Sequence, residues 1–169
     1  LIGFLTPVLA AGDPPGRVGR LSQVDGDVTF RADRQDPGGP AAINWPISSG
    51  AIIDTERRSR AEVWVGSTAY RLAGNSRAEF VTVDDQIVDL LLASGTLAVT
   101  IRDRNQADNL QISTPGGRVR FPGPGRYRIE VRPDRTTVAA QSGSAEILTD
   151  EQPAVVRAGE IASLDERGL

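Results

Sequence analysis

Residues 59–66 read SRAEVWVG and residues 76–83 read SRAEFVTV, so the same four letters open two segments that lie 17 positions apart. Both segments alternate small or apolar side chains with polar ones, which is the period of a β-strand with one buried face. In the first segment we expect Ala61 to face the core and Arg60 and Glu62 to face solvent. The spacing then indicates two successive strand–turn–strand returns, and not a binding motif used twice.

Short alternating runs separated by Gly, Pro, Asn or Asp continue along the rest of the chain. The clearest is residues 126–132, RYRIEVR, in which every second residue is apolar. The 18 Gly and 11 Pro punctuate these runs, and we find no stretch of ten residues with a helical apolar period. The fold class predicted is all-β: an irregular β-solenoid-like or sandwich stack of short antiparallel hairpins, with an apolar N-terminal tail.

Three local expectations follow from the patterns in the middle of the chain. Residues 87–92 are apolar on both faces and predict a buried central strand. Ser94-Gly95 predicts a turn into a new strand at residues 97–101. Residues 102–109, RDRNQADN, predict a charged loop.

The composition excludes much chemistry. The chain has 169 residues, a formal net charge of -3, no His and no Cys. Nucleophiles activated by His are therefore excluded, as are the common zinc, haem and iron–sulfur ligand sets. Two carboxylates can catalyse glycoside hydrolysis. With 22 acidic residues, however, a suitable pair arises by chance, and the chain has few aromatic residues to bind a sugar. We expect no enzyme, no catalytic residues and no cofactor.

Two other motifs are better explained by turns than by ligands. Asp25 with Asp27, and Asp84 with Asp85, are paired carboxylates of the kind that suits calcium. No EF-hand loop accompanies them, and Asp is a preferred turn residue, so no metal is predicted. Gly116-Gly117 lacks the Lys-Ser/Thr and the helix start of a phosphate-binding loop.

The first residues, LIGFLTPVLAAG, are apolar up to Asp13. A run of about 11 residues is too short to span a bilayer, so no transmembrane span is expected. It is typical of the end of a signal-peptide apolar region, although an ordinary N-terminal strand is the alternative. If this apolar segment is retained, it has to be buried against the rest of its own chain or against a neighbouring subunit. The predicted assembly contacts are Leu1, Ile2, Phe4, Leu5, Val8 and Leu9.

Several stretches in order resemble the FecR-like periplasmic domain family, over roughly residues 17–165. They are RVGRLSQVDGDV (17–28), Trp45, SGAIIDT (49–55), SRAEV (59–63), GSTAYRL (66–72), LASGTLAV (92–99), ISTP (112–115), PGRYRI (124–129), DRTTV (134–138) and GSA (143–145). The resemblance implies an exported, non-enzymatic β-rich domain of residues 17–169 after an N-terminal segment and linker of residues 1–16. In the best-known members such a domain relays an outer-membrane signal to a sigma factor. This chain looks more like free-standing exported members, so a periplasmic or extracellular location is expected.

A run of arginines supplies the candidate binding residues. Five of them are predicted to contact an anion or a partner: Arg118, Arg120, Arg126, Arg128 and Arg132. Such side chains can bind the phosphate or carboxylate groups of an envelope glycan or lipid. The alternative is a solvated face, cross-paired with Glu130, Asp134 or Glu146, whose charges protect sheet edges. Exposed aromatics for base stacking are few, so no nucleic acid is expected.

The function predicted is an exported, non-catalytic β-rich interaction or structural module of the bacterial cell envelope, with a protein partner or self-association. Two alternatives remain open at this stage. One is a self-assembling subunit of an extracellular filament, joined through the apolar N-terminal segment. The other is binding of an anionic glycan or lipid through an Arg face.

Overall fold

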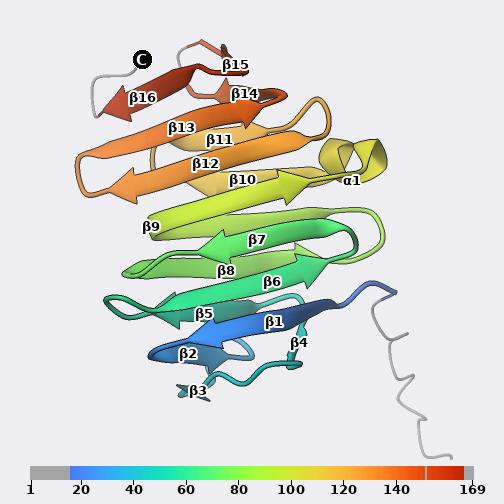
Figure 1. The fold of residues 1–169 in the computed structure, drawn as a ribbon, viewed down its shortest axis with the longest axis vertical. Helices are drawn as coiled ribbons and strands as arrows, with labels where there is room; N and C mark the ends of the chain where they lie inside the picture. Colours follow the sequence, from blue (N-terminus) through green and yellow to red (C-terminus); the bar gives the residue numbers. More distant parts are fainter. Residues whose placement is uncertain (1–15, 151, 166–169) are drawn as a thin grey trace, which may run out of the picture.

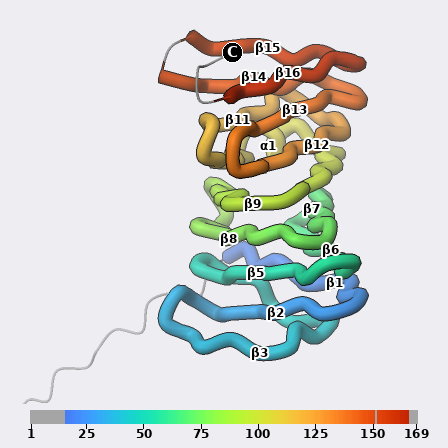
Figure 2. Tube along the Cα trace, turned by 90° about the vertical axis from the view of Figure 1, so that its left-hand side faces the viewer, coloured from blue at the N-terminus to red at the C-terminus, as the bar shows by residue number. Residues whose placement is uncertain are grey.

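The computed structural model describes residues 16–150 and 152–165, which form two β-sheets packed face to face (Figure 1). Apart from one short helix, the regular structure of these residues is β, so the predicted all-β class is confirmed. The hairpins succeed one another from one end of the molecule to the other, with β2 and β3 at one end and β14, β15 and β16 at the opposite end (Figure 2). The predicted apolar tail, residues 1–15, lies outside the described residues.

Sheet A faces the viewer in Figure 1. Its strands, in spatial order, are β4 (Pro46–Ile47), β1 (Gly19–Asp25), β6 (Arg60–Val65), β7 (Thr68–Leu72), the second half of β9 (Val88–Ile101), β12 (Gly125–Arg132), β13 (Arg135–Ser142) and β16 (Ile161–Asp165).

Sheet B lies behind sheet A and shares β9 with it. Its strands, in spatial order, are β3 (Gly39–Pro40), β2 (Val28–Arg31), β5 (Ala51–Thr55), β8 (Ser76–Val83), the first half of β9, β10 (Leu110–Thr114), β11 (Gly117–Arg120), β14 (Ser144–Leu148) and β15 (Ala154–Arg157). Among the described strands, β9 and β10 pair in parallel and the other pairs are antiparallel.

The core lies between the two sheets and is mostly aliphatic. Inward residues of both sheets form one buried cluster. Its aromatic members contact one another across the interior. Tyr70 of β7 meets Phe80 of β8 edge-on, with ring centroids 5.6 Å apart, and Phe121 lies 4.6 Å from the ring of Tyr127. The strands of each sheet direct every second side chain inward, so these rings meet between the sheets and pack sheet A against sheet B.

The two SRAE segments open strands in different sheets. The first leads into β6 of sheet A, whereas the second forms the start of β8 in sheet B. Each serine is buried and bonds a neighbouring segment. Ser59 Oγ accepts a hydrogen bond from the amide of Asp27 at 2.8 Å, and Ser76 Oγ accepts one from the amide of Thr96 at 2.9 Å. The prediction of two successive strand–turn–strand returns is confirmed, because β6 pairs antiparallel with β7 and β8 pairs antiparallel with β9.

The predicted turn at Ser94-Gly95 is wrong, because β9 runs on without reversing. Its first half pairs with β8 and its second half with β7 and β12. The change of sheet falls at Gly95, whose φ is 86° and whose missing Cβ leaves room for Ser76. A positive φ is costly for residues with a Cβ, so glycine allows a bend here without ending the strand.

A short helix, α1 (Arg104–Asp108), occupies part of the segment that the sequence predicts as a charged loop. Asp103 caps it by accepting a hydrogen bond from the amide of Gln106 at 3.2 Å. The Gln106 side chain in turn accepts hydrogen bonds from the Ser67 amide at 3.1 Å and from the Thr68 hydroxyl at 2.8 Å. The helix thus packs onto the β6–β7 turn. Within residues 16–150 and 152–165, no helix has the length and apolar character that a membrane crossing requires.

Gly95 and Gly159 provide a matched test of the β9 bend. Both have φ of 86°, but a Cβ at Gly95 would lie 2.2 Å from Ser76 Oγ, whereas a Cβ at Gly159 meets nothing within 4 Å. We expect Gly159→Ala to lower the free energy of unfolding by about 1 kcal/mol through backbone strain alone. Gly95→Ala should lower it by about 3 kcal/mol or more, because steric overlap adds to the strain. Urea denaturation of both variants measures the difference, and equal losses would contradict the tight packing of the bend.

Candidate functional site: the cationic face of sheet A

The structure divides the five predicted arginines between the two outer faces of the molecule. Arg118 and Arg120 lie on β11 in sheet B. Arg126, Arg128 and Arg132 lie on β12 in sheet A. All five are exposed and alternate with buried residues, so each group points away from the shared core. They do not form one ladder, and the two groups have to be judged by their separate surroundings.

The sheet B group lies beside acidic and apolar neighbours. Arg120 stands directly opposite Glu146 of β14 in the sheet register. Arg118 stands opposite Leu148 on one side and Ser113 on the other. A carboxylate directly across the strand offsets the charge of Arg120. The sheet B face therefore differs from that of sheet A in having a carboxylate directly opposite one of its two arginines.

The sheet A group has different surroundings. Arg132 Nε lies 2.7 Å from Glu130 Oε1, so its charge is already matched on the same strand. No ion pair joins Arg126 or Arg128 to a carboxylate of the described residues. Their cross-strand neighbours are uncharged: Thr100 and Ser142 beside Arg126, and Ala98 and Ala139 beside Arg128. Of the three predicted arginines in sheet A, Arg126 and Arg128 are therefore the two whose charge is open to a ligand.

A fixed polar cluster adjoins these two arginines on the same sheet. Glu62 of β6 accepts hydrogen bonds through Oε1 from Ser22 Oγ at 2.9 Å and from Trp64 Nε1 at 2.5 Å. Its other oxygen, Oε2, lies 2.6 Å from Arg71 Nε. The carboxylate is largely shielded from solvent, with a side-chain exposure of 17%. Glu62 thus holds Arg71 and the Trp64 indole in place at the surface.

Two further contacts extend this cluster towards β12. The Arg102 guanidinium lies over the Trp64 ring, with its central carbon 4.9 Å from the ring centroid, which is a cation–π geometry. Arg71 donates a hydrogen bond to Thr100 Oγ1 at 3.3 Å. We name Arg71, Arg102, Arg126 and Arg128 together the cationic face. The sequence did not predict the first two, because both are positioned by contacts between strands distant in sequence.

The surroundings of Glu62 also set its protonation. Burial works to raise the pKa of this carboxyl, but hydrogen bonds from Trp64 and Ser22 and the charge of Arg71 outweigh it, so the pKa lies below its usual value. Glu62 is consequently ionised at neutral pH. Its negative charge offsets that of Arg71 and leaves the charges of the other three arginines of the cationic face unmatched by Glu62.

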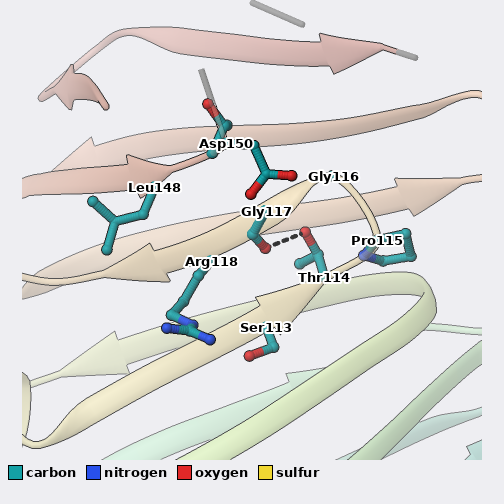
Figure 3. Close-up of a pocket in the computed structure, with 9 residues that line it drawn as sticks. Ser113, Thr114, Pro115, Gly116, Gly117, Arg118, Leu148 and Asp150 are labelled. Atoms are coloured by element: carbon teal, nitrogen blue, oxygen red, sulfur yellow. Dashed lines mark hydrogen bonds between the residues drawn. The ribbon is translucent and has the colours of Figure 1, made fainter. Parts of the chain in front are cut away.

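The clefts of the described residues offer weaker candidates. One of about 390 Å³ lies at the β10–β11 turn (Figure 3). Thr114 Oγ1 donates to the carbonyl of Gly117 at 2.8 Å within it, and the ionisable residues that line it are Arg118 and Asp150. This combination contains no nucleophile paired with a base. The cleft is therefore a gap beside a tight turn and contains no catalytic constellation.

The paired aspartates act in turns where the structure resolves their contacts. Asp84 Oδ1 accepts hydrogen bonds from the amides of Gln86 at 2.7 Å and Ile87 at 2.8 Å. In the described part of the chain no three acidic residues gather as metal ligands would. The predicted assembly contacts from Leu1 to Leu9 lie outside the described residues, so self-assembly through them stays a prediction.

The fold is similar to that of solved structures. Two crystal structures of a candidate anti-sigma factor from Parabacteroides distasonis, at 2.50 Å and 1.65 Å resolution, each align with a TM-score of 0.61 and 14% sequence identity over 70% of this chain. The alignment covers 56% and 57% of those chains, so this chain spans little more than half of their length. No family model and no curated protein matches the sequence.

The Glu62 cluster predicts a pH dependence of stability. Because the pKa of Glu62 is lower in the folded chain than its usual 4.5, its ionised form stabilises the fold above that value, and this stabilisation is lost as the pH falls through the lowered pKa. Glu62→Gln should therefore lower the free energy of unfolding by about 1–3 kcal/mol at pH 7, and the deficit should shrink towards pH 3. Urea titrations at pH 7, 5, 4 and 3 measure it. Glu56→Gln removes one exposed charge as the control, and a deficit of Glu62→Gln that is constant across pH contradicts the assignment.

Proposed function

We propose that the chain is a non-catalytic interaction module of the bacterial cell envelope that contacts a protein partner through the cationic face of sheet A. The absence of His and Cys from the sequence removes the commonest nucleophilic and metal-dependent mechanisms. The fold is shared with a candidate anti-sigma factor, a class of regulator that works by binding other proteins. Export to the periplasm or the cell exterior is part of this proposal.

The single observation that carries the proposal is that Arg126 and Arg128 are exposed in the middle of a sheet and have no carboxylate partner among the described residues. Both lie on β12, which has β9 on one side and β13 on the other, so these arginines occupy the middle of a sheet face. Their neighbours across the strands are uncharged, and no described carboxylate pairs with them. Exposed guanidinium groups that are not used internally are suited to carboxylate partners and are enriched in protein interfaces.

A protein partner is favoured over a small ligand by the shape of this surface. The clefts at the β10–β11 turn and beside it are lined by none of the four arginines of the cationic face. A small molecule generally needs a concave site that covers most of its surface, whereas a protein can use a broad sheet face. The anionic glycan or lipid predicted as an alternative shares the required charge and remains a competing ligand for the same arginines.

A capture experiment tests the proposed function. The chain, immobilised through its C-terminus, is exposed to a solubilised envelope fraction of its own organism at about 50 mM salt. We expect a protein to be retained by the wild type and lost with Arg126→Glu/Arg128→Glu, because reversing two charges replaces attraction by repulsion. Retention should also fall as the salt is raised. Bound proteins are identified by mass spectrometry.

The chain supplies its own control on the opposite face. Arg118→Glu/Arg120→Glu makes the same change of net charge on sheet B, where Glu146 already offsets Arg120. This variant should retain the partner at the wild-type level. Equal losses in both double variants would show a general charge effect and would contradict a site on sheet A, and retention by neither wild type nor variants would contradict the module itself.

A further inference from the structure

The arginines of the cationic face are spaced regularly along β12 and across the strands of sheet A. Binding to an acidic surface of no particular shape would not require such a spacing. Arg126 and Arg128 are two positions apart on one strand, so they point outward together with the repeat of an extended chain, about 6.8 Å. Arg71 lies on β7, across Ala98 of β9 from Arg128 in the register. Two strand spacings, about 9.6 Å, separate the two arginine rows.

A strip of small side chains lies between these rows. Ala98 and Thr100 of β9 are the outward residues there, both half-buried, and each is directly opposite one of the β12 arginines. On the β7 side the strip is bounded by Arg71, which bonds Thr100. A polypeptide chain in extended conformation fits above such a strip, because it needs only small side chains beneath it and space for about one strand width on either side.

We propose that the cationic face binds an extended acidic segment of a partner protein, which lies along β9 with carboxylates at alternate positions directed to Arg126 and Arg128. This inference rests on the proposed function and names the chemistry of the partner. In an extended chain, residues i and i+2 project to the same side with the spacing of the two arginines. Each carboxylate then meets one guanidinium fork in a bidentate hydrogen bond.

The Glu62 cluster gives this site its polarity. Glu62 places one negative charge at the β6 edge of the cationic face and holds Arg71 by its Nε. Because Glu62 already matches the charge of Arg71, an acidic segment is drawn more strongly to the β12 side, where Arg126 and Arg128 are without described carboxylate partners. Arg71 positions the segment through its remaining donors, and Arg102 adds charge above Trp64. Each exposed pair contributes little alone, so the recognition depends on several at once and weakens with salt.

Two synthetic peptides of identical composition test the pattern. In one nine-residue peptide three Glu residues alternate with Ser and Thr, and in the other the three Glu residues are contiguous. Binding of the fluorescein-labelled peptides is measured by fluorescence polarisation at 25 mM and 150 mM salt. We expect the alternating peptide to bind about fivefold more tightly or better, because in an extended chain it presents all three carboxylates on one side. Equal affinities overturn the alternating pattern.

Variants of the protein locate the binding. Arg126→Glu/Arg128→Glu should weaken binding of the alternating peptide by about 100-fold or more, and Arg128→Lys should weaken it by several-fold because the charge stays but the fork is lost. Arg118→Glu/Arg120→Glu should leave the affinity within about twofold. Circular dichroism of each variant checks that the fold is retained. An equal loss with the sheet B variant overturns the site.

Two further experiments distinguish the acidic segment from an anionic glycan or lipid, and distinguish failure of this inference from failure of the proposed function. Heparin and vesicles of anionic phospholipid are added as competitors, and if either binds the cationic face more tightly than the alternating peptide, the acidic-segment proposal is overturned in favour of an anionic glycan or lipid. If the envelope capture still depends on Arg126 and Arg128 while the two peptides bind equally, the interaction module stands and the alternating pattern fails.

Discussion

The continuity of β9 is the constraint on which the rest of the structure depends. One strand serves both sheets, and the bend at Gly95 passes it from sheet B to sheet A while Ser76 packs against that glycine. The amide of Thr96 bonds Ser76 Oγ directly after the bend, so the crossing is fixed by a buried hydrogen bond. Hairpins before and after β9 then add on both sheets, because each half of this strand offers two sides for pairing.

This arrangement explains why neighbouring segments of sequence have opposite surroundings. The β10–β11 hairpin continues sheet B, whereas the next hairpin, β12–β13, pairs with the second half of β9 in sheet A. Arginines only six positions apart, Arg120 and Arg126, consequently face opposite directions. A single charged run in the sequence is therefore divided between two surfaces: Arg120 stands opposite Glu146, whereas Arg126 and Arg128 stand opposite uncharged residues.

Local patterns predicted the strands well and their partners poorly. The alternating runs at residues 76–83 and 126–132 match strands β8 and β12 to within one residue, because alternation and flanking turns are properties of the segment itself. The parallel pairing of β9 with β10 and the contacts of Glu62 with Ser22 and Arg71 join residues far apart in sequence. No local periodicity encodes such pairings. For the candidate site, Arg126 and Arg128 were therefore predictable, whereas Arg71 and Arg102 were not.

The position of β12 decides between two explanations of its arginines. Outward charges protect a sheet edge from pairing with other chains, and this was one interpretation of the arginine run. β12 is not an edge, since β9 and β13 flank it. The last strand of sheet A among the described residues is β16, and its outward Ile161 is apolar and 69% exposed. The arginines of β12 therefore do not protect a sheet edge, and the acidic partner proposed above is the explanation that their placement favours.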